Sequence, residues 1–114
     1  MHEVGIVSGI LQTVLSTARE AQVSRVVSVT LRLGDMREVV PEALSFAWET
    51  LREDDPLTAQ AQLITEDVHP RSLCLTCGVE FDHDRFHCRC PQCDGAETQL
   101  VHGRELDLVN MVVE

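Results

Sequence analysis

The sequence has no lysine and no tyrosine, and aromatic residues make up only 4% of its 114 positions. Its nine basic side chains are all arginine and stand against 19 acidic ones, so the formal net charge is −10. A surface this acidic repels phosphate backbones, which disfavours a nucleic-acid partner. Because aromatics are scarce, we expect valine and leucine to fill the core.

Long apolar runs are missing as well. No stretch approaches the roughly 20 residues that a membrane span needs, and the N-terminus lacks the basic residues and apolar run of a signal peptide. We therefore expect a cytoplasmic protein without a membrane partner. Thiols stay reduced in that compartment, so clustered cysteines indicate metal binding rather than disulfides.

Hydrophobic periodicity predicts an α+β fold. Apolar residues recur every three or four positions over residues 4–22, which predicts an amphipathic helix. They alternate over residues 25–33, which predicts a strand, and Pro41 fits the first turn of a second helix. Residues 58–67 and 105–113 are the other predicted strands. We expect two helices packed on a small mixed three-stranded sheet.

The composition changes at His69-Pro70. Residues 70–97 contain all five cysteines and few aliphatic residues, so they cannot build an ordinary core. This predicts a zinc-ribbon-like module inserted into the α/β part. The predicted domains are residues 1–69, completed by a strand at 103–114, and the cysteine module at 70–102.

Two cysteine pairs predict a metal site in this module. Cys74 and Cys77 form one pair, Cys90 and Cys93 form the other, and 12 residues separate the pairs. Two such turns supply the four thiolates of a tetrahedral zinc ion, and a site with all four positions filled is structural rather than catalytic. Such a site contributes on the order of 10 kcal/mol to the folding of its module. A rubredoxin-like iron site is the alternative.

Three further residues of the module could interact with a metal. Cys88 is too close to Cys90 to replace it comfortably, so we expect it to be a spare thiol. His83 and His87 lie between the two pairs, where we expect them to be exposed or adjacent to the metal ligands.

The N-terminal residues Met1, His2 and Glu3 suggest a second metal site. The terminal amine, the deprotonated amide nitrogen of His2 and its imidazole Nδ1 can chelate one ion in five- and six-membered rings. In-plane nitrogen donors favour square-planar Ni(II) or Cu(II). One planar position stays open, for which the backbone or side chain of Glu3 or a distant histidine is a candidate. By itself the Met-His opening is a weak signal.

Taken together, these features resemble the HypA family, which inserts nickel during maturation of nickel–iron hydrogenase. The chain opens Met1-His2-Glu3 and runs into a helix, a strand ends in Gly34, and a helix begins at Pro41. The cysteine pairs follow, and the end reads Gly103-Arg104-Glu105-Leu106. The similarity covers the whole chain, and the order of the parts is its specific element.

The resemblance implies a nickel metallochaperone, not an enzyme. It implies that His2 and Glu3 build the nickel site in the 1–69 domain, and that Ni2+ is transient cargo whereas Zn2+ is structural. The implied partners are the GTPase HypB and the hydrogenase large subunit, and in some bacteria urease is also served. We expect a monomer or weak homodimer.

Two other functions stay open at this point. A zinc-ribbon module that binds another protein or nucleic acid fits the cysteine pairs, although the acidic charge and few aromatics oppose nucleic acid. A rubredoxin-like electron carrier would be coloured. No catalytic Ser/His/Asp or Cys/His set is recognisable in local motifs, which argues against an enzyme.

Overall fold

The computed structural model describes residues 2–114, so the predicted nickel ligand Met1 lies outside the described residues. The chain forms two compact units. The helical unit comprises the residues up to Leu31 together with Val39–Thr65 and Leu108–Glu114, and the cysteine unit comprises Arg32–Glu38 and Glu66–Asp107. The functional domains expected from the sequence, with boundaries at 69/70 and 102/103, remain predictions.

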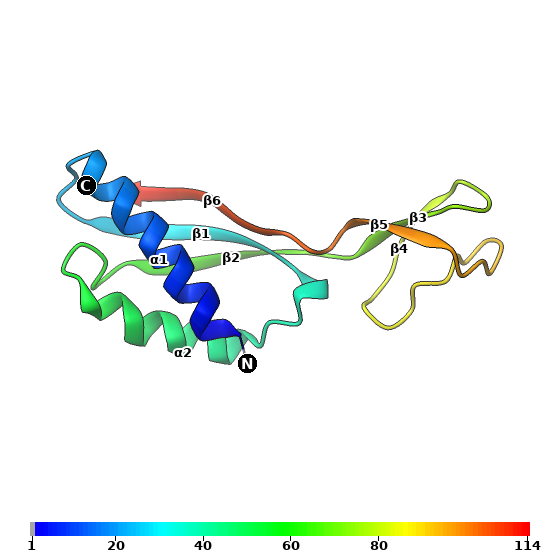
Figure 1. The fold of residues 1–114 in the computed structure, drawn as a ribbon, viewed down its shortest axis with the longest axis horizontal. Coiled ribbons are helices and arrows are strands. Elements are labelled where there is room, and N and C mark those ends of the chain that lie inside the picture. Colours follow the sequence, from blue (N-terminus) through cyan, green and yellow to red (C-terminus); the bar gives the residue numbers. More distant parts are fainter. Residues whose placement is uncertain (1) are drawn as a thin grey trace. The chain divides into compact units, whose positions relative to one another are not determined.

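Two helices form one layer of the helical unit (Figure 1). Helix α1 spans Glu3–Glu20 and α2 spans Pro41–Leu51, which confirms both predicted helices. Pro41 occupies the first turn of α2, where its missing N–H has no helical partner to lose. Helix α1 ends two residues before the predicted position because Gln22 adopts a left-handed φ of 55°. Neither helix in residues 2–114 is long and apolar enough to cross a membrane.

The sheet associated with these helices has three strands in the order β2-β1-β6. Strand β1 spans Val26–Gly34, β2 spans Gln62–Val68 and β6 spans Leu106–Val113. Backbone hydrogen bonds join Arg25 to Glu114 and Gly34 to Glu105, so β6 runs antiparallel to β1. Two hydrogen bonds give the direction of β2. The Val26 N–H donates to the Leu57 carbonyl just before β2, and the Arg32 side chain donates to the Glu66 side chain within β2. The residue numbers rise together along both strands, so β1 and β2 are parallel. The predicted mixed three-stranded sheet is confirmed.

The predicted start of β2 was wrong by four residues. Residues 56–60 form turns instead of extended strand. The Thr58 hydroxyl donates to the Arg52 carbonyl, and the Thr58 N–H donates to the Asp55 carbonyl. Such local bonds from a threonine compete with strand pairing. Ala61 then donates to the Thr58 carbonyl, and the strand begins at Gln62.

The core of the helical unit forms where α1, α2 and β1 bury their apolar residues. In β1 the burial extends to Ser28 and Thr30, which alternation had assigned to a polar face. Both are short side chains on the central strand of the sheet, which has a neighbouring strand on each edge. The fully or nearly fully buried apolar side chains that these three elements contribute to the helical unit are Val7, Leu11, Val14, Ala18, Val26, Val29, Leu31, Leu44, Ala47 and Trp48.

The cysteine unit contains a small antiparallel sheet in the order β4-β3-β5. Strand β3 spans Arg71–Cys74, β4 spans Glu80–Asp82 and β5 spans Thr98–His102. These strands were not predicted, because they are short and carry few aliphatic residues. Their sheet places Cys74 in a small buried cluster with Phe81 and Cys90.

Candidate metal centre

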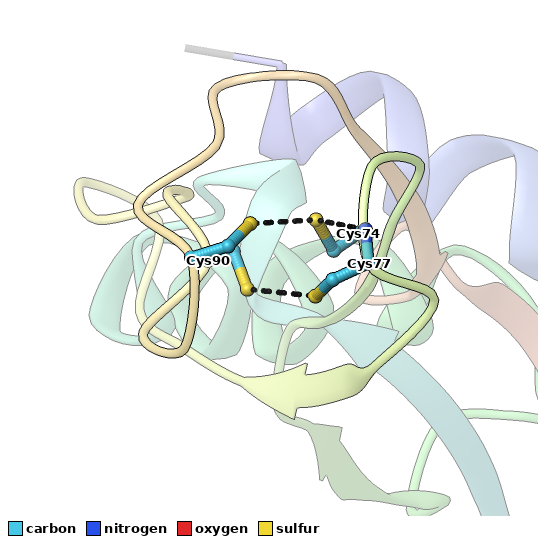
Figure 2. Close-up of side chains that lie close together, drawn as sticks. Cys74, Cys77 and Cys90 are labelled. Atoms are coloured by element: carbon cyan, nitrogen blue, oxygen red, sulfur yellow. Dashed lines mark hydrogen bonds between the residues drawn. The ribbon is translucent and has the colours of Figure 1, made fainter.

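The four predicted zinc ligands meet at one point of the cysteine unit. The sulfurs of Cys74, Cys77, Cys90 and Cys93 all lie within 4.8 Å of one another. The Sγ–Sγ distance is 3.5 Å for Cys74–Cys93 and 3.6 Å for Cys77–Cys90. Figure 2 shows the side chains of Cys74, Cys77 and Cys90 pointing toward one another. Zinc–sulfur bonds of about 2.3 Å in a regular tetrahedron require sulfurs about 3.8 Å apart. The cluster therefore fits a structural zinc ion.

The first pair sits on a tight turn after β3. The Cys77 N–H points at Cys74 Sγ, with 3.5 Å between nitrogen and sulfur, and the Gly78 N–H donates to the Cys74 carbonyl at 2.9 Å. Gly78 has φ = +82°, a conformation that glycine adopts without steric cost. This turn brings both sulfurs of the pair to the same side of the backbone.

In the second pair, Asp94 takes the left-handed conformation and Gly95 leaves room for the sulfurs. Asp94 donates its N–H to the Cys90 carbonyl at 2.9 Å and takes the left-handed φ of 57°, the position that Gly78 holds in the first turn. Asp tolerates this region better than most residues. Gly95 follows because a Cβ there would lie 3.1 Å from Cys93 Sγ and 3.6 Å from Cys74 Sγ.

An arginine secures this second turn. Arg89 Nε donates to Asp94 Oδ1 at 3.1 Å, and its terminal nitrogen donates to the Asp94 carbonyl at 2.9 Å. These two bonds join the residues immediately before and after the Cys90–Cys93 pair. The local sequence did not reveal this interaction, because it depends on the turn that Asp94 makes.

The sulfurs strongly influence one another's protonation. The backbone N–H of Cys77 lowers the pKa of Cys74 to about 6. At Cys93 the N–H of Gly95 acts in the same direction, but the neighbouring thiols and desolvation outweigh it and raise the pKa to about 12. Four thiolates at this spacing repel one another, so complete deprotonation requires a cation among them.

Cys88 and the two histidines of the module lie outside the four-sulfur cluster formed by the described residues. The Cys88 carbonyl accepts a hydrogen bond from the Thr98 hydroxyl at 3.1 Å. His83 Nε2 lies 2.7 Å from the hydroxyl of buried Ser72, whereas the exposed His87 pairs through Nδ1 with Asp84 at 2.8 Å. Both imidazoles therefore already have a protein partner, whereas the bond at Cys88 involves its backbone and not its thiol.

The two described candidates for the nickel site, His2 and Glu3, lie in different environments. His2 is exposed and directly precedes α1, and its carbonyl accepts the Ile6 N–H at 3.0 Å. Glu3 is only 4% exposed, and its carboxylate accepts the Val40 N–H at 3.2 Å. The other four histidines belong to the cysteine unit, so His2 is the histidine of the helical unit.

Comparison with known proteins identifies the family. The family model described as "Hydrogenase/urease nickel incorporation, metallochaperone, hypA" matches residues 1–113. The chain belongs to the HypA family. HypA proteins are nickel-binding maturation factors, and the whole-chain match confirms the resemblance that the sequence features had indicated.

Relatives and solved structures agree with this assignment. The chain is 41% identical over 111 residues to the hydrogenase maturation factor HypA of Chloroflexus aurantiacus, covering 96% of each chain. It is 37% identical over 113 residues to that of Synechococcus elongatus, covering 99% of each. The solution structure of the Ni metallochaperone HypA from Helicobacter pylori matches its fold with a TM-score of 0.71 at 22% identity, covering 99% of this chain and 97% of that one.

Proposed function

We propose that this chain is a nickel metallochaperone that binds Ni(II) at its N-terminus and delivers it for the maturation of nickel–iron hydrogenase. The observation that carries the proposal is the HypA family match over residues 1–113, which includes the Met1-His2-Glu3 opening. The exposed position of His2 in front of α1 supports it, because an incoming ion can reach the imidazole there.

The nickel site consists of Met1, His2 and Glu3. The Met1 amine, the His2 amide nitrogen and the His2 imidazole supply three donors in one plane, which favours Ni(II) over Zn(II). The His2 amide must lose its proton to bind. The residue precedes an 18-residue helix, whose positive end stabilises negative charge nearby. A fourth position that stays open suits a carrier, because a donor from the recipient can enter it and begin ligand exchange.

Zinc has a separate, structural role. Cys74, Cys77, Cys90 and Cys93 fill all four positions of a tetrahedral ion, which leaves no site for a substrate or a reacting water. The zinc then holds together a module with a small apolar cluster of its own. This chemistry supports a carrier protein rather than an enzyme.

The proposed partners follow from the family's role in hydrogenase maturation. Nickel would pass with the help of the GTPase HypB to the hydrogenase large subunit, and we add urease as a further client because the family description names it. Five unpaired cysteines fit a reducing compartment, so we place this exchange in the cytoplasm.

A nickel titration tests the proposal. The native chain, a form with one residue added before Met1, and His2→Ala are titrated with Ni(II) after expression without a tag. The added residue preserves every side chain but moves the amine out of register, so both altered proteins should lose tight binding and keep their zinc. Equally tight binding by His2→Ala would contradict an N-terminal nickel site.

A further inference from the structure

The cysteine unit contains a pocket that takes no part in the zinc cluster or in the proposed nickel site. It has a volume of about 390 Å³ and lies where Arg37 approaches the segment from Leu100 to Asp107. All of these residues belong to the same compact unit. The segment includes Gly103-Arg104-Glu105, so the pocket places the side chain of Arg104 beside that of Arg37.

Neither of these two arginines has an acidic partner among the described residues. Arg37 Nε donates to the Arg104 carbonyl at 2.8 Å, which leaves the terminal nitrogens of Arg37 for another acceptor. Both residues are exposed. Most arginines of this acidic chain are instead neutralised within the fold. Carboxylates pair with Arg19, Arg25, Arg32, Arg71 and Arg89.

The acidic residues of the pocket do not neutralise the two guanidinium groups. Glu105 faces its own turn, where Oε1 accepts the Gly103 N–H at 2.8 Å and Oε2 lies 3.5 Å from His102 Nδ1. Asp107 is exposed and forms no ion pair with any described residue. Two carboxylates therefore stand near two unpaired guanidinium groups. This balance favours a ligand with a single negative charge over a phosphate group, whose charge is close to −2.

Strand β5 forms another wall of the pocket. It is an edge of the β4-β3-β5 sheet, so within the described residues one side of its backbone has no neighbouring strand. Val101 lies at an irregularity of this strand, between the residues that pair with Arg71 and Ser72 of β3, and is 44% exposed. A free strand edge offers unpaired N–H and C=O groups to an extended peptide. The pocket thus joins an edge for backbone pairing to a site for an anionic side chain.

We propose that the pocket formed by Arg37, Arg104 and β5 binds an extended segment of another protein that carries an aspartate or glutamate side chain. The segment pairs with the free edge of β5, and its carboxylate accepts N–H groups of Arg37 and Arg104. Guanidinium groups match the planar geometry of a carboxylate, and such charge-assisted bonds are stronger than neutral ones. The proposal is independent of the nickel site, because every residue it uses belongs to the cysteine unit.

The charge of the whole chain gives this pocket a selective role. A net charge of −10 disfavours the approach of an acidic segment in general. Two unpaired guanidinium groups in one pocket create a local exception. Electrostatic complementarity of this kind determines which partner binds, and in which register, more than it determines the final affinity.

Two synthetic peptides test the proposal on the full, zinc-loaded chain. Acetyl-Thr-Val-Glu-Val-Thr-amide favours an extended conformation and carries one carboxylate, and its counterpart has Gln in place of Glu. Each peptide is titrated into isotope-labelled protein, and amide and arginine side-chain signals are followed by NMR. Sodium acetate and inorganic phosphate are added in separate competition experiments. Sedimentation of the protein without peptide reports self-association.

The protein variants are Arg104→Gln, Arg37→Gln and the control Arg85→Gln. The Arg104 side chain has no partner among the described residues, so its replacement leaves the fold intact. Arg85 is exposed in the same unit and lies 5.1 Å from the Phe86 ring centroid, outside the pocket. All three changes remove one positive charge. Zinc content and the amide spectrum verify the fold of each variant.

The Glu peptide should shift the amide signals of Val101 and His102 and the side-chain signals of Arg37 and Arg104. The Gln peptide should bind about tenfold more weakly, as should the Glu peptide to Arg104→Gln and to Arg37→Gln, because each change removes a charge-assisted hydrogen bond. Arg85→Gln should bind like the native chain. Acetate should displace the Glu peptide at least as well as phosphate does.

Several outcomes would overturn the proposal. If millimolar Glu peptide shifts none of these signals, or if the Gln peptide binds equally well, the pocket does not recognise an acidic segment. Native affinity in both Arg104→Gln and Arg37→Gln would exclude the guanidinium groups. Stronger displacement by phosphate would make this a phosphate site, and self-association that the Arg104 change abolishes would make a second copy the occupant. No nickel enters these measurements, so a failed nickel titration would contradict the proposed function alone.

Discussion

Gly34 and Gly103 lie backbone against backbone in the cysteine unit. A Cβ at position 34 would sit 2.1 Å from the Gly103 carbonyl oxygen, far inside any permitted contact. The Met36 N–H donates to that same oxygen at 2.8 Å, and the Gly34 N–H donates to the Glu105 carbonyl at 2.8 Å. Two sequence features that carry the family resemblance, the glycine that ends β1 and the Gly103-Arg104-Glu105 segment, are therefore one structural junction.

Replacing Gly34 should destabilise the protein. Gly34→Ala forces the two backbone segments apart, and overpacking of this kind costs about 1–3 kcal/mol or more. Chemical denaturation followed by far-UV circular dichroism measures the loss. Gly9→Ala is the control, because a Cβ at that position of α1 meets nothing within 4 Å. It should be neutral or stabilising by about 0.5–1 kcal/mol. Equal stability of the two variants would contradict the close approach.

Zinc content should depend on four of the five cysteines. Cys93→Ala removes one thiolate of the cluster, so we expect the protein to lose zinc and the cysteine unit to unfold while α1 and α2 persist. Cys88→Ser should keep one zinc per chain, since four sulfurs already complete a tetrahedron. Elemental analysis and X-ray absorption of purified protein check both expectations. Zinc loss from the Cys88 variant would show that a ligand has been misassigned.

The two glycines near the sulfurs should respond differently to enlargement. Gly95→Ala places a methyl group against Cys93 Sγ and Cys74 Sγ, so zinc should be released more readily to a chelator. Gly78→Asn meets open space and must only adopt φ = +82°, which asparagine tolerates. Its zinc should be released at nearly the native rate. Competition with a chromophoric chelator measures both, and faster release from the Gly78 variant would contradict the assignment.

Acid should weaken the junction through Glu105. Burial opposes ionisation of this side chain, but the N–H groups of Glu105 and Gly103, together with His102, outweigh it and lower its pKa below the usual 4.5. A lowered pKa stabilises the fold above the unfolded-state value, and this stabilisation is lost as the pH falls below about 4.5. Glu105→Gln should therefore reduce the loss of stability between neutral pH and pH 4.

Denaturation curves at several pH values test this expectation. Glu97→Gln removes an exposed glutamate of the same unit and serves as the control. Its pH dependence should match that of the native chain. Identical slopes for native protein and Glu105→Gln would show that the Glu105 contacts do not contribute.

Local sequence patterns, meaning residue spacings of two to four positions, were sufficient to predict the helices, the central strand and the sulfur cluster. The spacing of Val7, Leu11 and Val14 predicts α1, and the alternation of Val29, Leu31 and Leu33 predicts the central strand. The paired cysteines predict the sulfur cluster because two residues between thiols already constrain the geometry of each turn.

Features that depend on distant parts of the chain could not be predicted. Nothing near Glu3 in the sequence indicates that its carboxylate meets Val40, and periodicity favoured Val4 for the buried position. Strand β3 has only four residues and depends on β4 and β5 for its pairing. The start of β2 was misplaced because hydrogen bonds of Thr58 with Arg52 and Asp55 replace strand pairing there.

The burial of Trp48 gives the helical unit its own optical signal. It is the single tryptophan of a chain without tyrosine, and its indole N–H donates to the Ala61 carbonyl at 2.8 Å within the core of that unit. Fluorescence excited at tryptophan wavelengths therefore reports unfolding of the helical unit. Ultraviolet charge-transfer absorption of a thiolate-bound metal such as Co(II), substituted for zinc, would report the cysteine unit. The thermal unfolding transitions of the two units can thus be followed separately in a single sample.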